Sequence, residues 1–201
     1  MTGRFIVLEG GDGSGKSTLA KHLATRLRAR GIEVIETFEP GGTTLGSEIR
    51  ALLLDGSAVA PTTETLLMAA DRAQHISEIV RPAIDRGAWV VSDRHVPSSL
   101  VYQGVVRGLG VEEVERISTW ATGGLRPDLV VVIDVTDEVA EQRRSAGEDR
   151  MEREGAEFHA RVRAAYRELA AARGWCVLAG DASVEMVATG LFALVEPLME
   201  S

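Results

Sequence analysis

The chain opens with the stretch Phe5-Ile6-Val7-Leu8-Glu9-Gly10-Gly11-Asp12-Gly13-Ser14-Gly15-Lys16-Ser17-Thr18. Residues 10–18 match the pattern G-x-x-x-x-G-K-[ST], in which the glycines let consecutive backbone N–H groups turn around an anion. The apolar run before the pattern predicts a strand, and residues 19–30 after it predict a helix whose N-terminus faces the same anion. This order of strand, glycine turn and helix predicts a site for the phosphates of a nucleoside triphosphate.

The end of this loop carries two side chains suited to a triphosphate and its metal ion. Lys16 can reach the β- and γ-phosphates, and the Ser17 hydroxyl can bind Mg²⁺. A tight turn without a ligand is the alternative. The complete match between a strand and a helix argues against it.

Composition narrows the class of protein. A chain of 201 residues favours one domain with a single core, and its net charge of −8 offers no basic surface to duplex nucleic acid or an anionic membrane. The only cysteine, Cys176, excludes an intrachain disulfide and suits a reducing compartment. The chain has no apolar stretch as long as a membrane span, and no signal-peptide-like region follows Met1. We therefore expect a cytoplasmic protein with neither nucleic acid nor a membrane as partner.

Short apolar runs alternate with helical patterns along the chain. The strands are predicted at Arg4–Glu9, Glu33–Phe38, Trp89–Ser92, Leu129–Val135 and Trp175–Leu178. The helices are predicted at Ser17–Arg30 with Gly31 as its cap, Thr43–Leu54, Thr63–Arg86 with an interruption at Pro82, Val111–Thr122, Asp137–Arg144, Gly155–Arg173 and Val184–Met199. Strands without alternation are buried on both faces, which predicts a three-layer α/β fold: a five-stranded parallel sheet with helices on both sides. Ligands of such a sheet bind at the carboxyl ends of the strands.

Charged side chains follow two of these strands. Glu39, in Glu39-Pro40-Gly41-Gly42-Thr43, is predicted to project into the ligand crevice, with a solvated carboxylate on a plain turn as the alternative. Asp93 stands where an acid could hold Mg²⁺ or its water, and Arg94 could clamp a phosphate. A structural ion pair between Asp93 and Arg94 is the alternative. This alternative is less favoured because the predicted phosphate loop lies beside Asp93 and Arg94.

Three further segments hold candidate site residues. Met68 and Arg72 share one face of a helix, although Met68 could be core and Arg72 could pair on the surface with Asp71 or Glu64. The stretch Ser98-Ser99-Leu100-Val101-Tyr102-Gln103-Gly104 adds hydroxyl and amide groups to the same crevice. Residues 142–153 are dense in both charges, which fits a solvated junction or a mobile lid with arginines over a phosphoryl-transfer site.

Taken together, these stretches resemble the bacterial thymidylate kinases, a family of P-loop nucleoside monophosphate kinases. Besides residues 5–18, the resemblance rests on residues 39–43, Ala70-Asp71-Arg72-Ala73-Gln74-His75, Asp93-Arg94-His95, residues 98–104, Gly123-Gly124-Leu125-Arg126-Pro127-Asp128-Leu129 and Asp149-Arg150-Met151-Glu152. It implies a single P-loop kinase domain over residues 1–201 with a short lid at about 141–155. It also implies a homodimer. Gly13 stands where some members carry an arginine, and members with glycine there resemble this chain in placing the arginines in the lid.

The resemblance implies the phosphorylation of dTMP to dTDP by ATP and Mg²⁺, a step in dTTP synthesis. ATP phosphates would lie on Gly10, Gly11, Asp12, Gly13, Ser14, Gly15, Lys16, Ser17 and Thr18, with Arg143 and residues 179–181 near the adenine and with Ser17 and Asp93 on the metal. On the acceptor side, Arg72 would bond the thymine carbonyl and Arg94 the phosphate. Asp12 and Tyr102 would lie near the deoxyribose, and Glu39, Ser99 and Gln103 would line the same site. Arg144 or Arg150 would reach the transferring group when the lid closes.

Two positions depart from the family pattern. Met68 replaces the usual aromatic that stacks on thymine, which predicts weaker binding or looser choice of the base. Phe38 replaces an arginine of many relatives, which leaves more of the phosphate neutralisation to Arg94.

Other functions have less support in the sequence. A kinase for another deoxynucleotide or small acceptor is the nearest alternative. A nucleotide-binding switch is less favoured because the Asn-Lys-x-Asp stretch of GTPase switches is absent from the sequence. A catalytically silent relative is disfavoured by the presence of Lys16, Ser17, Asp93 and Arg94. The four histidines (His22, His75, His95 and His159) show neither metal-ligand spacing nor a nucleophilic constellation.

Overall fold

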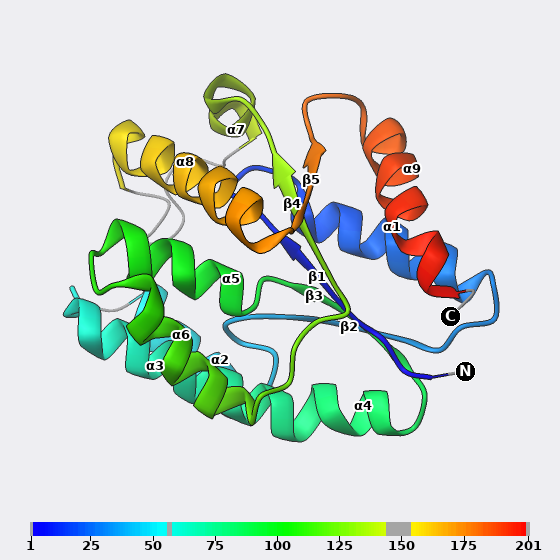
Figure 1. The fold of residues 1–201 in the computed structure, drawn as a ribbon, viewed down its shortest axis with the longest axis horizontal. Coiled ribbons are helices and arrows are strands. Elements are labelled where there is room, and N and C mark those ends of the chain that lie inside the picture. Colours follow the sequence, from blue (N-terminus) through cyan, green and yellow to red (C-terminus); the bar gives the residue numbers. More distant parts are fainter. Residues whose placement is uncertain (1, 56–57, 144–153, 200–201) are drawn as a thin grey trace.

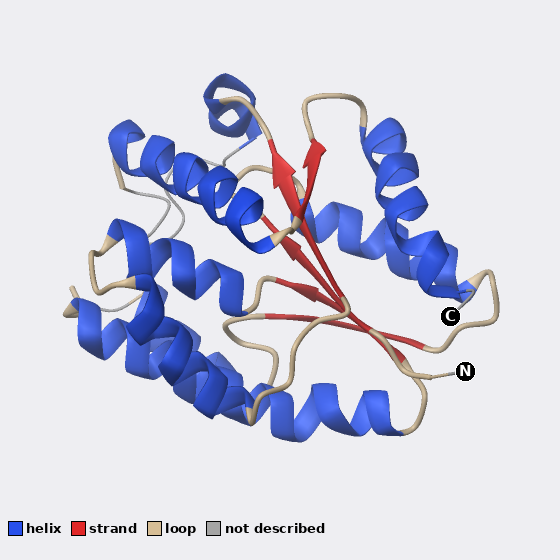
Figure 2. Ribbon diagram, viewed as in Figure 1, coloured by secondary structure: helices blue, strands red, loops and turns tan. Residues whose placement is uncertain are grey.

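The computed structural model describes residues 2–55, 58–143 and 154–199. Its centre is a five-stranded parallel sheet in the order β2-β3-β1-β4-β5 (Figures 1 and 2). The strands are β1 (Phe5–Glu9), β2 (Val34–Phe38), β3 (Trp89–Asp93), β4 (Leu129–Asp134) and β5 (Cys176–Ala179). The predicted α/β fold is confirmed, and every strand lies within one residue of its predicted bounds.

Alternate side chains of β1 enter two different layers of the core. Ile6 and Leu8 pack against α1 (Lys16–Arg28) and α9 (Val184–Val195) on one face of the sheet. Phe5 and Val7 face the other layer, which contains the helical segment at residues 76–85. Figure 1 shows α1 and α9 together on one side of the strands. Burial on both faces explains the continuous apolar runs that the strands show in sequence.

The remaining helices cover the second face and the strand ends. They are α2 (Thr44–Leu54), α3 (Pro61–His75), α4 (Arg81–Asp85), α5 (Val96–Ser99), α6 (Val111–Thr122), α7 (Asp137–Arg143) and α8 (Ala156–Arg173), and a 3₁₀ turn, η3 (Glu196–Met199), follows α9. Among the described residues, no helix is both long and apolar enough to cross a bilayer.

Two helices differ from prediction at a glycine or a proline. The α1 helix ends at Arg28, and Gly31 has a left-handed φ of 80° in the turn beyond it, where the N–H of Gly31 bonds to the carbonyl of Arg28. The interruption expected at Pro82 is a π-helical turn, η1 (Ile76–Val80), that joins α3 to α4. Its closing bond runs from Arg81 N to Ile76 O, five residues back, and this wider turn accommodates the proline without ending the helix.

One helical segment was not predicted at all. The chain from Val96 to Val106 forms α5 and then the π-helical segment η2 (Leu100–Val106), whose Leu100, Val101, Tyr102 and Val106 are buried. Pro97 and Gly104 weaken the helical signal of this stretch, whereas packing of η2 against α6 and α8 stabilises it. The segment carries Ser98, Ser99, Tyr102 and Gln103 to the cavity at the carboxyl ends of the strands.

Candidate active site

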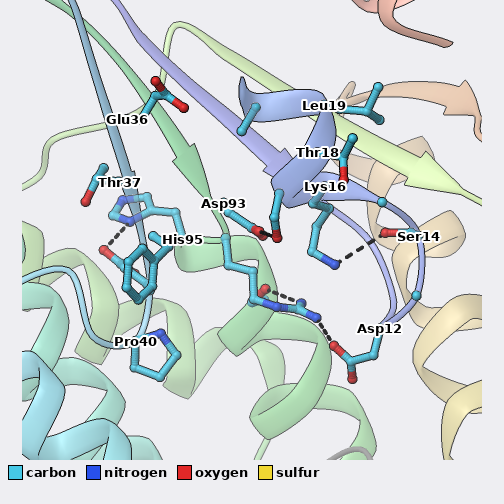
Figure 3. Close-up of a pocket in the computed structure, with 18 of the residues that line it drawn as sticks. Asp12, Ser14, Lys16, Thr18, Leu19, Glu36, Thr37, Pro40, Asp93 and His95 are labelled. Carbon is cyan, nitrogen blue, oxygen red and sulfur yellow. Dashed lines mark hydrogen bonds and ion pairs between the residues drawn. The ribbon is translucent and has the colours of Figure 1, made fainter. Parts of the chain in front are cut away.

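A cavity of about 930 Å³ opens at the carboxyl ends of β1, β2 and β3. Its lining joins the phosphate loop at one end to α3, α5 and η2 at the other, as the close-up in Figure 3 shows in part. Of the sequence-predicted site residues that the structure describes, all but Gly10, Gly11, Ala179 and Asp181 line this cavity. Arg144 and Arg150 of the predicted lid lie outside the described residues.

The phosphate loop has a backbone that only glycine adopts readily. Gly13 has φ 80°, and a Cβ built there would lie 2.4 Å from the carbonyl oxygen of Ala140. Lys16 is 6% exposed, and its Nζ donates to the carbonyl of Gly11 at 2.8 Å and to Ser14 Oγ at 3.3 Å. Burial lowers the pKa of Lys16 from its ordinary value. The ammonium group is therefore held over the loop where an anion would bind.

Two oxygen ligands suitable for a divalent cation meet beside this lysine. Ser17 Oγ donates to Asp93 Oδ2 at 2.5 Å, and the second carboxylate oxygen of Asp93 is buried without a protein partner. A buried carboxylate oxygen without a hydrogen bond is unfavourable unless an ion or a water completes it. The donor set of one hydroxyl and one carboxylate fits Mg²⁺, which also takes ligands from phosphates and water.

Arg143 lies at the far side of the loop, where the adenine was predicted. Its Nη1 donates to the carbonyl of Gly180 at 3.0 Å, and both residues line the cavity. The neighbouring Asp181 accepts a hydrogen bond from the backbone N–H of Thr136, which holds the turn after β5 against the end of β4. The two segments named in the prediction, α7 and residues 179–181, are thus brought together.

At the opposite end of the cavity, Arg94 is held by four side chains. Its Nη2 pairs with Asp12 and donates to the hydroxyl of Tyr102 at 3.3 Å. Its Nη1 donates to Ser98 Oγ at 3.0 Å and to Tyr166 Oη at 3.1 Å. The predicted alternative, an ion pair with Asp93, is replaced by the pair with Asp12, because Asp93 bonds Ser17.

The backbone of Arg94 has an unusual torsion. Its φ is 73°, and it is the only non-glycine residue with a positive φ among those described. This left-handed conformation follows β3 directly, and it is held by bonds from Arg94 N to Leu8 O and from Ser92 Oγ to Arg94 O. The torsion occurs at the point where the side chain enters the cavity.

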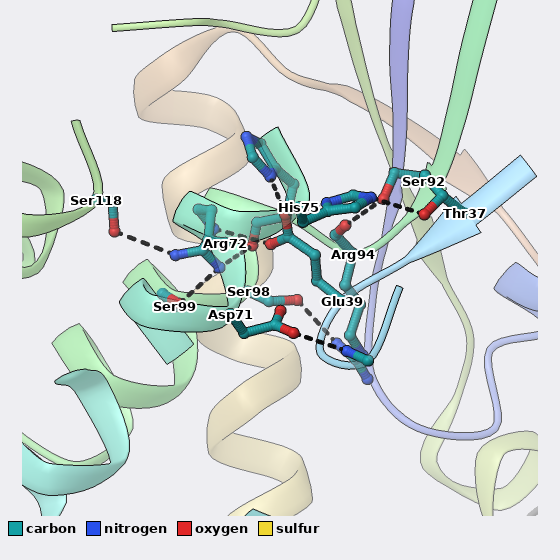
Figure 4. Close-up of polar contacts among 12 residues, drawn as sticks. Thr37, Glu39, Asp71, Arg72, His75, Ser92, Arg94, Ser98, Ser99 and Ser118 are labelled. Carbon is teal, nitrogen blue, oxygen red and sulfur yellow. Dashed lines mark hydrogen bonds and ion pairs between the residues drawn. The ribbon is translucent and has the colours of Figure 1, made fainter. Parts of the chain in front are cut away.

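Arg72 is buried, which rules out the surface salt bridge with Asp71 or Glu64 that was the alternative for it. Its guanidinium is 2% exposed, and its Nε donates to Glu39 Oε2 at 2.8 Å. Its Nη2 donates to Ser99 Oγ at 3.0 Å and to the carbonyl of His95 at 3.2 Å, and its Nη1 donates to Ser118 Oγ at 3.4 Å (Figure 4). A cavity-lining arginine is thus fixed from behind by hydrogen bonds.

Glu39 is also buried, which excludes the solvated carboxylate that was the alternative for it. Its Oε1 accepts from His75 Nδ1 at 2.8 Å and from His95 Nδ1 at 2.9 Å, while Oε2 accepts from Arg72. Burial raises the pKa of Glu39, but the charge of Arg72 and the hydrogen bonds from His95 and His75 hold it well below its ordinary value. The peptide bond from Glu39 to Pro40 is cis. Although Glu39 lines the cavity, its carboxylate is occupied by this cluster.

The wall between the two arginines is made by Met68, Tyr102 and Gln103. Met68 is half-buried on α3, and Gln103 Nε2 donates to Glu64 Oε1 at 2.8 Å. The Tyr102 hydroxyl donates to Asp12 at 3.3 Å, and burial raises the pKa of Tyr102 above its ordinary value, so the phenol keeps its proton. The three residues line the cavity, as the resemblance implied.

Sequence reasoning missed a cation in this cavity. Arg50 of α2 lines it, with its guanidinium carbon 5.8 Å from the centre of the Phe38 ring and its Nη1 donating to the carbonyl of Pro40 at 2.9 Å. Its only sequence signal is the spacing of four from Gly46, which places both residues on the helix face toward the turn at Gly41. Arg50 therefore places a cation beside Phe38.

Comparison with known proteins decides the family. The sequence model of the thymidylate kinase family matches residues 8–190. The chain belongs to the thymidylate kinase family. Among its relatives, the thymidylate kinase of Synechococcus sp. (strain CC9605) is 48% identical over 200 residues, which cover 95% of this chain and 96% of the relative. That of Leifsonia xyli subsp. xyli is 50% identical over 173 residues, covering 84% of this chain and 82% of the relative.

Membership in the thymidylate kinase family confirms the resemblance read from the seven sequence stretches. The match includes the phosphate loop, the turn at Glu39, the arginines of α3 and β3, and the segment of residues 144–153 that the structure does not describe. The roles of individual residues in this thymidylate kinase family member remain predictions.

Proposed function

We propose that the chain transfers the γ-phosphoryl group of ATP to dTMP and so forms dTDP and ADP. The observation that carries this proposal is geometric: Lys16 of the triphosphate loop and Arg94, the predicted acceptor clamp, face one cavity. Family membership supports the same reaction. A cytoplasmic location is part of the proposal, because a lone cysteine suits a reducing compartment.

The donor end would bind the triphosphate through its backbone and one ammonium group. The N–H groups of the loop and the N-terminus of α1 would surround the phosphates, and Lys16 would neutralise the β- and γ-oxygens. Ser17 and Asp93 would hold Mg²⁺, which supplies further neutralisation of the transferring group. Arg143 and the turn at Gly180 would border the adenine.

The acceptor end would bind dTMP between its two arginines. Arg94 would take the phosphate and Arg72 the thymine carbonyl, with the half-buried Met68 on the face of the base. Tyr102 would crowd a 2′-hydroxyl, and Asp12, Ser99 and Gln103 would contribute hydrogen bonds. Glu39 would act indirectly, since its carboxylate holds Arg72.

Chemistry at this site would require positioning more than proton transfer. The second pKa of a phosphate monoester is about 6, so the acceptor oxygen is already ionised at neutral pH and requires no general base. Transfer then depends on in-line alignment and on charge neutralisation by Lys16 and Arg94. Arg144 or Arg150 would add positive charge from the lid.

The direct test is ADP release from Mg-ATP with dTMP, dUMP, dCMP, CMP, AMP, GMP or no acceptor. Strong turnover with dTMP alone is expected. Equal turnover with several pyrimidines would favour the alternative, a kinase with a relaxed base site caused by Met68. Release that ignores every acceptor would contradict the proposal and leave a nucleotide-hydrolysing module.

We also propose that the chain forms a homodimer through a face of α2, α3 and α6. Large apolar side chains are exposed on these helices: Leu45 and Leu52 of α2, Leu66 of α3, and Trp120 of α6, whose side chain is 84% exposed. Since α3 packs against both α2 and α6, the three helices form one continuous surface. Exposed apolar side chains gathered on one surface favour an interface between proteins, and the family resemblance makes a second copy the partner.

A further inference from the structure

A buried carboxylate lies behind Arg94 and has no part in the proposed reaction so far. Glu9, the last residue of β1, is 0% exposed. Its Oε1 accepts from the backbone N–H of His95 at 2.8 Å and of Ser98 at 3.3 Å, while its Oε2 accepts from Ser98 Oγ at 2.6 Å and Tyr166 Oη at 2.8 Å. Four donors from two separate segments, residues 95–98 and α8, therefore meet on one fully buried side chain.

Both hydroxyl groups that donate to Glu9 also touch Arg94. Arg94 Nη1 lies 3.0 Å from Ser98 Oγ and 3.1 Å from Tyr166 Oη (Figure 4 shows the contact with Ser98). A hydroxyl carries one proton, so a hydroxyl that gives its proton to a carboxylate must turn its lone pairs toward the guanidinium. The carboxylate thereby orients both hydroxyls, whose oxygens lie 2.9 Å apart, as acceptors for the two N–H bonds of Arg94 Nη1.

The charges around the two hydroxyls fix the protonation of Tyr166 and Arg94. Burial, reinforced by the charge of Glu9, raises the pKa of Tyr166 well above its ordinary value, so the phenol retains the proton that it donates. Burial lowers the pKa of Arg94, but the charges of Asp12 and Asp93, together with the phenol oxygens of Tyr102 and Tyr166, hold it well above its ordinary value. Arg94 therefore stays charged and Tyr166 stays neutral.

We propose that Glu9, Ser98 and Tyr166 are positioning residues that form an acceptor platform for Arg94. The platform fixes the Nη1 side of the guanidinium from within the protein. The Nη2 side bonds Asp12 and Tyr102, which line the cavity with Arg94, so the guanidinium is held from both sides where the acceptor phosphate would bind. The inference rests on the proposed function, since it assigns the purpose of the platform to the binding of dTMP.

The first experiment measures the Kd of dTMP and, separately, of ATP by calorimetry for wild type, Tyr166→Phe and Ser98→Ala. Each variant removes one acceptor of Arg94, so each should weaken dTMP binding about tenfold, the effect of one hydrogen bond to a charged group, and change ATP binding less than about twofold. Thr65→Val is the matched control. It removes a hydroxyl that is 3% exposed on α3, bonds to the carbonyl of Pro61 and does not line the cavity.

A second arm separates positioning from a general loss of structure. If Tyr166 acts through Arg94, then Tyr166→Phe should add less than about twofold to the Kd in an Arg94→Lys background. Glu9→Gln should weaken dTMP binding at least as much as either hydroxyl variant, because an amide that donates to a hydroxyl turns that hydroxyl's proton toward Arg94. Its melting temperature should not fall, since burial raises the pKa of Glu9 and thus disfavours the ionised carboxylate in the fold.

The outcomes are distinct. Unchanged dTMP affinity in Tyr166→Phe and Ser98→Ala would overturn the platform while the proposed function stands. So would a Tyr166→Phe variant that raises the Kd of dTMP by the same factor in the Arg94→Lys background as in wild type. Failure of wild type to bind dTMP would overturn both. Loss of dTMP and ATP affinity together, with a lower melting temperature, would assign the three residues to the fold alone.

Discussion

Among single residues, the arginines of the acceptor end differ in how they are held. Arg72 is enclosed, with its guanidinium bonded to Glu39, Ser99, Ser118 and the carbonyl of His95. Arg50 lies at the cavity mouth, where one backbone carbonyl accepts its hydrogen bond. Fixed rotamers bind a ligand without a further loss of conformational freedom, whereas a freer arginine can adjust to it. Arg50 therefore offers an exposed and less constrained cation beside Phe38.

Met68 gives a prediction about the base. Met68→Phe should lower the KM for dTMP several-fold, because stacking of a base on an aromatic ring is worth roughly 1–3 kcal/mol and a thioether replaces it only in part. Steady-state kinetics with varied dTMP test this. Met186→Phe, at a methionine that is 67% exposed on α9, is the control and should leave the KM unchanged. An unchanged KM in Met68→Phe would refute the prediction.

Asp93 gives a prediction about the metal ion. Asp93→Asn should raise the Mg²⁺ concentration needed for half-maximal rate, because it removes charge from the oxygen that bonds Ser17 and from the unpartnered oxygen beside it. The rate measured against Mg²⁺ at fixed ATP tests this, with Asp55→Asn at the exposed end of α2 as the control. The acidic limb of the pH–rate profile should persist, since a general base loses activity when it is protonated at low pH; disappearance of this limb would show that Asp93 acts as a general base.

At the scale of helices and strands, the sequence best predicted the elements that a local pattern of apolar residues determines. Apolar runs marked all five strands, and topology alone placed Asp93 and Arg94 beside the phosphate loop. The helical segment from Val96 to Val106 was missed because tertiary packing outweighs Pro97 and Gly104 there. The bond between Glu9 and Tyr166 joins residues 157 positions apart, and no local pattern indicates such a pair. The occupied state of Glu39 was missed for the same reason, since its partners come from α3 and the end of β3.

The phosphate loop allows a test within a single element. Gly13→Ala should destabilise the protein by on the order of 1–3 kcal/mol, because Gly13 has φ 80° and its Cβ would meet the carbonyl oxygen of Ala140 at 2.4 Å. Gly11→Ala is the matched control in the same loop: its Cβ would find no atom within 4 Å. Denaturant unfolding measures both free energies. Equal stability of the two variants would show that the loop adjusts to a side chain at position 13.

The chain has a net charge of −8, and several of its exposed large apolar side chains lie on α2, α3 and α6. The sheet is covered by helices on both faces, so large apolar side chains at the surface of α2, α3 and α6 are not needed for the core. Trp120 is the most exposed of the large apolar residues described. A solvated position of this kind is consistent with burial against a second copy.

Dimer formation can be tested by introducing a charged side chain on the exposed apolar surface of α2, α3 and α6. Trp120→Arg and Leu52→Arg should each shift the chain toward monomer, because burial of an unpaired guanidinium in an apolar interface is unfavourable. Sedimentation velocity at several protein concentrations measures the change. Met186→Arg adds the same charge at an equally apolar exposed site on α9 and should leave the association state as in wild type. A wild-type chain that sediments as a monomer would refute the dimer.

The left-handed backbone at Arg94 also bears on protein engineering. An L-residue with φ 73° costs about 1–2 kcal/mol that glycine does not incur, so Arg94→Gly should unfold at a higher temperature than Arg94→Ala although both lack the guanidinium. Glycine at position 94 would however remove the guanidinium that pairs with Asp12 and bonds Ser98 and Tyr166, and it would leave the carboxylate of Asp12 without its ion-pair partner. Any stabilised variant should therefore keep Arg94, because the contacts of its side chain offset the cost of its own backbone torsion.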